Sequence, residues 1–233
     1  MTTPQHNLAV IKVVGIGGGG TNAIKRMIGE GMTGVDFIAL NTDEQDLLDC
    51  DAPTKLDIGQ STTRGLGAGA DPAVGERAAR DNSQDIEDVL TGADMVFVTA
   101  GEGGGTGTGG APIVAGIARG LGALTVAVVT KPFSFEGKRR ADNAEHGIEK
   151  LRDACDTLIT IPNDRLLQQE DKTISINEAF SKADEVLFNG VQGITDLIST
   201  PGLINVDFAD VKSVLADSVS YTHLRAHETR GNL

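Results

Sequence analysis

Aromatic residues are scarce in this chain of 233 residues, which has no tryptophan and one tyrosine. With aromatics at 3%, the core must be built from valine, isoleucine, leucine and alanine, a composition that suits a parallel sheet covered by helices. Cysteine is scarce as well, because Cys50 and Cys155 are the only two and their spacing matches no zinc motif. The sequence therefore predicts a reduced protein without a metal site of its own.

Positive charge is also in short supply, since 20 Lys and Arg against 33 Asp and Glu give a net charge of −13. A nucleic-acid binder usually carries a basic stripe, and the one basic run here is Lys138–Arg140. No apolar run approaches the roughly twenty residues that span a bilayer, and Met1–Asn7 lacks the apolar core of a signal peptide. We expect a cytoplasmic protein that binds no nucleic acid and does not insert into a membrane.

Glycine is abundant, with 30 residues, and much of the excess lies in two clusters. The richer cluster, Gly101–Gly110, stands between an apolar segment and a helical pattern, with Thr106 and Thr108 among its glycines. Glycines let successive backbone N–H groups point into one concavity, and a following helix adds its positive dipole end. A flexible linker is the alternative, but linkers rarely join a buried strand to an apolar helix. The cluster therefore predicts a phosphate loop.

The first cluster, Gly15–Asn22, reads G-x-G-x-x-G after an apolar run. Asp43 stands about where the ribose-binding acid of a dinucleotide fold would be, which favours a Rossmann-type oxidoreductase as an alternative. A dinucleotide fold gives no reason for a second, richer glycine turn about eighty residues later. The two clusters together favour one polyphosphate held from two sides, and neither carries the lysine of a P-loop.

Apolar runs that predict strands alternate with helical patterns along the chain, at residues 8–14, 35–40, 95–98, 124–129 and 158–161. This alternation predicts an α/β fold with a doubly wound, mostly parallel sheet that binds ligands at the carboxyl ends of its strands. The pattern predicts a continuous loop at 52–75, one helix at Arg77–Leu90 and a long helix at 177–199.

Gly103–Gly109, with the sequence GGGTGTG, resembles the signature loop of the tubulin/FtsZ family of GTPases. Four further segments resemble the FtsZ branch of that family, which forms the bacterial division ring: Gly17–Asn22, Thr130–Arg140, Pro162–Leu166 and Asn205–Asp210. The resemblance implies a protein that binds GTP or GDP, hydrolyses GTP and assembles head to tail in the cytoplasm, at the mid-cell ring. It also implies an active site shared between subunits, and Mg²⁺ held mainly by the nucleotide phosphates.

On this resemblance we expect a flexible N-terminus at 1–7, a GTP-binding domain at 8–176, a central helix at 177–199, and a catalytic loop with the start of the next helix at 200–218. Residues 219–233 have no counterpart in the family and are interpreted as a disordered or unrelated tail. FtsZ proteins continue into a second domain and a tail that binds other division proteins, and this sequence has neither. A nucleotide-binding fragment that caps filaments with little turnover is therefore the alternative.

The resemblance assigns the two glycine clusters to the nucleotide site through Gly18, Gly19, Gly20, Thr21, Asn22, Gly103, Gly104, Gly105, Thr106, Gly107 and Thr108. Glu136 and Arg140 match positions near the ribose and phosphates, although residues spaced i,i+4 on a helix also form ordinary surface ion pairs. Asn163 matches another site position, although Pro-Asn-Asp by itself is a turn and helix cap.

Phe180 and Asp184 are four residues apart and therefore share a helix face, where the plain interpretation is a core ring beside a solvated acid. The resemblance implies that the ring stacks on a purine and that Asn22 also touches the base. The Asp184 carboxylate would accept from guanine N1–H and N2–H₂. Adenine offers no such pair of donors, and an unpaired buried acceptor costs on the order of 1–3 kcal/mol. Asp184 is therefore the predicted specificity residue.

Asp207 and Asp210 are the predicted catalytic residues. By spacing alone, Asp207 is a good N-cap and Asp210 a capping-box-like residue at the third helical position. The resemblance implies instead that both carboxylates enter the nucleotide site of the next subunit and polarise the attacking water near Mg²⁺. Phosphoryl transfer needs mainly positioning and charge neutralisation, which carboxylates and a metal ion can supply.

Overall fold

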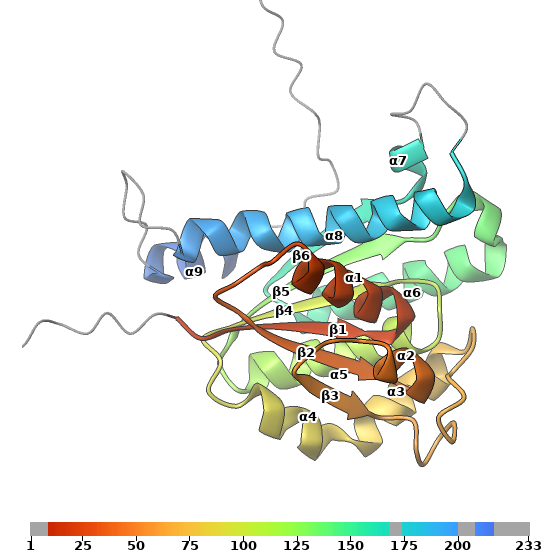
Figure 1. The fold of residues 1–233 in the computed structure, drawn as a ribbon. Helices are drawn as coiled ribbons and strands as arrows, with labels where there is room; N and C mark the ends of the chain where they lie inside the picture. The colour runs from red at the N-terminus through yellow and green to blue at the C-terminus, as the bar shows by residue number, and fades with distance from the viewer. Residues whose placement is uncertain (1–8, 168–173, 200–207, 217–233) are drawn as a thin grey trace, which may run out of the picture.

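The structure is a computed structural model that describes residues 9–167, 174–199 and 208–216. A single parallel sheet lies at the centre of this part of the chain. Its strand order is β3-β2-β1-β4-β5-β6, and every neighbouring pair is parallel (Figure 1). The strands are β1 (Ile11–Ile16), β2 (Asp36–Asn41), β3 (Thr54–Asp57), β4 (Met95–Gly101), β5 (Leu124–Lys131) and β6 (Thr157–Pro162). The chain reverses its direction of travel across the sheet between β1 and β4, and such a switch point opens a crevice at the strands' carboxyl ends.

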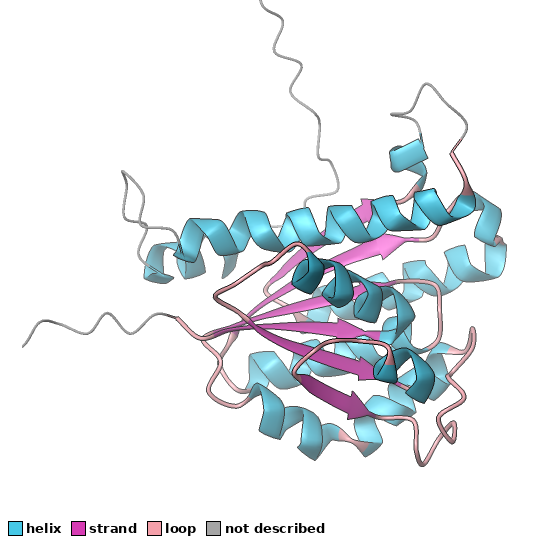
Figure 2. Cartoon of the chain, in the orientation of Figure 1, coloured by secondary structure: helices cyan, strands magenta, loops and turns pink. Residues whose placement is uncertain are grey.

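Helices cover both faces of this sheet (Figure 2). One face carries α1 (Gly17–Gly29), α2 (Glu44–Leu48) and α8 (Ile176–Ser199). The other carries α3 (Pro72–Asp81), α4 (Ser83–Leu90), α5 (Thr106–Gly120) and α6 (Lys138–Ala154). Three short elements complete the described chain: η1 (Ser134–Glu136), α7 (Asp164–Leu167) and α9 (Phe208–Ala216). Within the described residues, no helix combines the length and hydropathy that a membrane span requires.

The predicted α/β fold, with its doubly wound parallel sheet and the long helix after it, is confirmed, and α8 begins one residue before the predicted start. Two local predictions were wrong. The predicted loop at 52–75 contains the edge strand β3, whose half-exposed side chains leave no apolar run to detect. The predicted helix at Arg77–Leu90 is two helices joined at Asn82, whose side-chain amide donates to the Ala78 and Ile58 carbonyls at 2.8 and 3.2 Å.

Several predicted segments lie outside the described residues. These are the flexible N-terminus at 1–7, the tail at 219–233, and all of the catalytic loop and next helix at 200–218 except the α9 residues. The two cysteines are described, and both are buried and free.

α3 packs against the first turns of α5 so closely that glycine backbone faces backbone. A Cβ on Gly109 would overlap the Pro72 carbonyl oxygen, and a Cβ on Gly75 would overlap the Gly105 carbonyl oxygen. Gly116 lies on the same helix, and a Cβ there would meet nothing within 4 Å. The glycines at this crossing therefore fix where α5 begins, and with it the second glycine cluster.

We expect Gly109→Ala to lower the free energy of unfolding by about 1–3 kcal/mol, because the added methyl group forces α3 away from α5. Gly116→Ala is the matched control and should raise the free energy of unfolding by about 0.5–1 kcal/mol through helix propensity. Urea unfolding followed by circular dichroism measures both. Equal stabilities of the two variants would contradict the proposed close contact.

Candidate functional site

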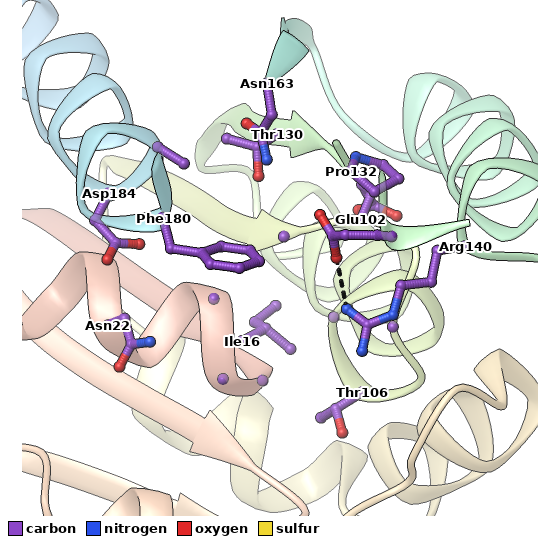
Figure 3. A pocket seen from close by; sticks show the side chains of 18 of the residues that line it. Ile16, Asn22, Glu102, Thr106, Thr130, Pro132, Arg140, Asn163, Phe180 and Asp184 are labelled. Atoms are coloured by element: carbon purple, nitrogen blue, oxygen red, sulfur yellow. Dashed lines mark hydrogen bonds and ion pairs between the residues drawn. The ribbon is translucent and has the colours of Figure 1, made fainter. Parts of the chain in front are cut away.

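A cavity of about 320 Å³ opens at the carboxyl ends of β1 and β4, where the strand order reverses (Figure 3). The starts of α1 and α5 line its phosphate-loop side, while the β5–α6 connection and the first half of α8 line the rest. The predicted site residues that line it are Gly18, Gly19, Asn22, Gly104, Gly105, Thr106, Gly107, Glu136, Arg140, Asn163, Phe180 and Asp184.

The two glycine clusters touch each other at this cavity. A Cβ on Gly17, whose φ is +68°, would lie 2.9 Å from the Gly107 nitrogen, and a Cβ on Gly19 would lie 3.0 Å from the Gly101 nitrogen. Neither α1 nor α5 has a side-chain hydrogen bond at its N-cap. The first N–H groups of two helices, and the positive ends of two helix dipoles, are therefore directed at one cavity, which is the environment of an anion site.

The threonines of the second cluster hold the loop in shape. The Thr106 and Thr42 hydroxyls are 2.6 Å apart, and the Thr108 hydroxyl accepts from the Gly103 N–H at 2.7 Å. Gly104, in contrast, lies open, because a Cβ there would meet nothing within 4 Å. The predicted residues of the two glycine clusters that do not line the cavity are Gly20, Thr21, Gly103 and Thr108, and all four are buried.

The lining of the cavity beside the glycine clusters includes Glu136, Arg140 and Asn163. Arg140 Nη1 lies 2.7 Å from Glu136 Oε2, so the ion pair expected from i,i+4 spacing forms within the site. Asn163 is buried, and its Oδ1 has no hydrogen-bond partner among the described residues. The arrangement leaves a guanidinium and an amide oxygen available to a ligand.

Phe180, Asp184 and Asn22 lie on one side of the cavity, away from Thr106 and Arg140 (Figure 3). Burial raises the pKa of Asp184 to about 6, against the lowering effect of Arg26 and then Lys25 on α1. The half-exposed Phe180 ring and this carboxyl come from one face of α8, as their spacing predicts. The cavity therefore has a flat apolar contact and a hydrogen-bond acceptor at one end and N–H donors at the other.

Asp210 does not belong to this cavity, and Asp207 lies outside the described residues. Asp210 is exposed on α9, at the far end of α8 from the cavity (Figure 1). The Thr157 hydroxyl, at the first residue of β6, donates to the Leu215 carbonyl of α9. α9 is therefore attached at the amino ends of the strands, whereas the cavity opens at their carboxyl ends.

A model of the tubulin/FtsZ family GTPase domain matches residues 10–171 of this chain. The chain belongs to the tubulin/FtsZ family. Among solved structures, FtsZ from M. jannaschii, an empty dimer, is 50% identical with a TM-score of 0.89, and the match covers 93% of this chain and 63% of that one. CetZ2 from Haloferax volcanii, a GTPγS-bound protofilament, is 23% identical with a TM-score of 0.76 over 88% of this chain and 62% of that one, which supports the fold alone. The chain thus spans less than two thirds of these relatives' length.

This tubulin/FtsZ domain also has cavity residues that the sequence prediction missed: Ile16, Gly17, Gly69, Gly101, Glu102, Thr130, Pro132, Ala183 and Leu187. Some had a usable signal, because Gly17, Gly101 and Glu102 lie inside or beside the predicted phosphate loops. Gly69 had none, since it comes from the segment predicted as an unplaced loop. Among the described residues, no group of three or more His, Cys, Asp or Glu side chains is placed to hold a metal ion.

Glu102 is a buried acid within the second glycine cluster of this family domain. It is 4% exposed, and neither carboxyl oxygen has a hydrogen-bond partner among the described residues. Its carboxyl group packs against α6 at Gly147, where a Cβ would lie 2.5 Å from Oε2. Burial raises the pKa of Glu102 to about 8, partly offset by the nearby Thr108 hydroxyl. The group is therefore mostly neutral at pH 7.

Glu102 makes stability depend on pH. Its folded-state pKa of about 8 exceeds the ordinary 4.5, so the stabilisation from its bound proton is complete below about pH 4.5 and is lost as pH rises through about 8. Glu102→Gln keeps the shape and removes this titration. Between pH 5 and pH 8 the parent should lose a few kcal/mol of stability that the variant keeps. We therefore expect the free energy of unfolding of Glu102→Gln minus that of the parent to rise by this amount over the same range.

Denaturant unfolding at several pH values measures this difference. Glu87→Gln, at an exposed position on α4, is the control and should leave the pH dependence unchanged. A Glu102→Gln profile that runs parallel to the parent's from pH 5 to pH 8 would show that Glu102 is not a buried titrating group.

Proposed function

We propose that this chain binds GTP and GDP in the cavity between α1, α5 and α8, and hydrolyses GTP as a subunit of a head-to-tail polymer in the division ring. The polyphosphate lies between the two glycine clusters, which approach it from two sides with backbone N–H groups. Such a site suits a chain of net charge −13, because it needs no field of basic side chains. Family membership in a GTPase domain supports this assignment over the oxidoreductase alternative.

As the family resemblance implies, a magnesium ion would arrive with the nucleotide and be held mainly by its phosphates. Such an ion would supply neutralisation of the negative charge that develops during phosphoryl transfer. Arg140, beside the phosphate loops and 48% exposed in its side chain, contributes a second positive charge, and Glu136 holds its guanidinium in place. Asn163 is positioned to accept a hydrogen bond from the nucleotide.

Guanine is the base that best matches the end of the cavity formed by α8. Phe180 presents a ring for stacking, and Asp184 on the next turn presents a carboxylate to N1–H and N2–H₂ of guanine. Asn22, from the first turns of α1, lies on the same side of the cavity. The specificity depends on the ionised state of Asp184, because a protonated carboxyl group has lost one acceptor.

We expect the affinity for GDP to fall as pH decreases through about 6, the pKa of Asp184. From pH 7 to pH 8 the contribution of Asp184 to the affinity should stay constant, because its carboxyl group is already ionised. Asp184→Asn should weaken GDP binding about ten- to a hundredfold and remove the contribution of Asp184 to the pH dependence near 6, leaving that of the GDP phosphate. The same variant should bind xanthosine diphosphate better than the parent does, because the new amide N–H₂ can donate to the C2 carbonyl of xanthine. Calorimetric titrations at pH 5, 6 and 7 measure these effects, and unchanged guanine preference in Asp184→Asn would contradict them.

The position of Asp210 is the observation that carries the assembly part of the proposal. α8 rises about 1.5 Å per residue, so its cavity end at Phe180 and its far end at Ser199 are separated by about 28 Å. Asp210, attached beyond that far end, is out of reach of its own cavity and free to enter the cavity of another copy stacked head to tail. Asp207, three residues earlier in sequence, is proposed to act with it.

In this arrangement the two carboxylates accept hydrogen bonds from a water molecule and orient it towards the terminal phosphorus. The glycine loops hold the phosphate oxygens at the same time, so that positioning and charge neutralisation come from two different subunits. Leu66 is 83% exposed and lies three residues before Gly69, which lines the cavity. It provides apolar surface for the second subunit to cover. The related M. jannaschii FtsZ was solved as a dimer, which supports association between copies of this chain.

A mixing experiment tests the shared site. Asp210→Ala keeps the cavity, whereas Gly104→Leu adds a bulky side chain to its lining, at a position where a Cβ would meet no atom within 4 Å. Each variant alone should hydrolyse GTP at least tenfold more slowly than the parent. Their mixture should recover activity, because Asp210 of one variant enters the intact cavity of the other.

GTP hydrolysis per molecule, measured against protein concentration, completes the test. For the parent we expect this specific activity to rise above a threshold concentration, since the active site forms only on association. Activity that is independent of concentration and not recovered on mixing would contradict a shared site. GTP binding without turnover would favour the nucleotide-binding fragment that caps filaments.

A further inference from the structure

Three phenylalanine rings meet beside the base end of the cavity. Phe133 and Phe135 are stacked, with ring centroids 4.9 Å apart and planes 9° apart. Phe180 stands perpendicular to both, at 5.4 Å from Phe133 and 6.3 Å from Phe135, with an interplanar angle of 89° in each case. These are favourable stacked and edge-to-face geometries for aromatic pairs. We call these three residues the aromatic cluster.

The members of the aromatic cluster differ in burial. Phe133 is 1% exposed and belongs to the fully buried part of the protein, whereas Phe135 is 50% exposed and Phe180 is 40% exposed. Phe180 lines the cavity, and Phe135 does not. Phe135 therefore has no direct contact with the space that a nucleotide would occupy, yet its ring contacts one that does.

The segment that carries Phe133 and Phe135 is held in place by polar contacts. The Phe133 N–H donates to Glu136 Oε1 at 2.8 Å, and the Ser134 N–H donates to Asp164 Oδ1 of α7 at 2.9 Å. Glu136 is in turn paired with Arg140. The stacked pair of rings is thus attached to a fixed turn, while Phe180 comes from a separate helix, α8.

We propose that Phe135 is a positioning residue for base binding, which holds the Phe180 ring in the orientation that stacks on guanine. This inference rests on the proposed function of the cavity. A half-exposed phenylalanine on a helix surface can occupy more than one rotamer, and the two perpendicular contacts restrict it to one. Fixing the ring before the ligand arrives removes part of the entropic cost of binding. Phe135 thereby affects the base without touching it.

A double-mutant cycle tests whether Phe135 acts through Phe180. We expect Phe135→Ala to weaken GDP binding about three- to tenfold, in line with the loss of an aromatic pair. In a Phe180→Ala background, Phe135→Ala should cause no further loss, because the ring that it positions is already absent. Phe135→Tyr keeps the ring and should bind GDP like the parent. Calorimetry at a protein concentration below the assembly threshold measures all four variants.

A ligand without a base separates positioning from a general disturbance of the site. Ribose 5′-diphosphate should bind Phe135→Ala and the parent equally, because it lacks the base on which Phe180 is proposed to stack. Leu121→Ala, a change of similar kind at a partly exposed position after α5, should leave GDP binding unchanged. Additive losses in the cycle, or an equal weakening of GDP and ribose 5′-diphosphate binding in Phe135→Ala, would overturn the inference while leaving the proposed function in place. A parent chain that binds no GDP would overturn both.

Discussion

Two helices begin at almost the same point in space, and the rest of the structure depends on that close approach. α1 and α5 start after neighbouring parallel strands, β1 and β4, and their first turns touch where only glycine leaves room. A Cβ at Gly17 or Gly19 would press on the backbone of the other cluster. Because side chains are excluded there, two sets of uncapped N–H groups converge on one cavity, and an anion can approach the backbone directly.

The convergence of helix N-termini explains how a strongly acidic chain can form an anion site. Peptide dipoles provide the positive potential locally, and α3 secures the start of α5 through backbone contact at Gly109. The same crowding has a consequence for Glu102, which is enclosed between the phosphate loop and α6 and is held largely in its neutral form. A charged carboxylate at that place would oppose the potential that the two helices create.

The long helix α8 relates the two ends of the domain. Its first turns present Phe180 and Asp184 to the cavity, and its last turns lead towards α9 at the opposite edge of the sheet. A helix of this length separates the proposed base-binding end of the cavity from Asp210 within one chain. The separation makes association between copies a requirement of the proposed chemistry rather than an addition to it.

Local patterns were sufficient to predict much of this protein. Apolar runs, glycine clusters and helical spacing in the sequence determined the α/β class, the parallel sheet, the long helix and the glycine clusters that line one side of the cavity. These features depend on neighbours in sequence, and the steric freedom of glycine and the 3.6-residue period of a helix are visible there. The other predicted residues around the cavity came from the resemblance to the tubulin/FtsZ family. The spacing of Phe180 and Asp184 predicts that they share a helix face, and the structure shows that both line the cavity.

Only the tertiary structure decided the features that depend on contacts distant in sequence. Strand β3 is stabilised by pairing with β2 and carries no apolar run of its own, and Gly69 reaches the cavity only because its loop folds back onto Gly105. The burial of Glu102 depends on α6, forty-five residues later at Gly147, and the perpendicular packing of Phe180 on Phe135 joins a turn to a separate helix. Sequence spacing determines which residues share a face, but the packing of one element on another determines what that face meets.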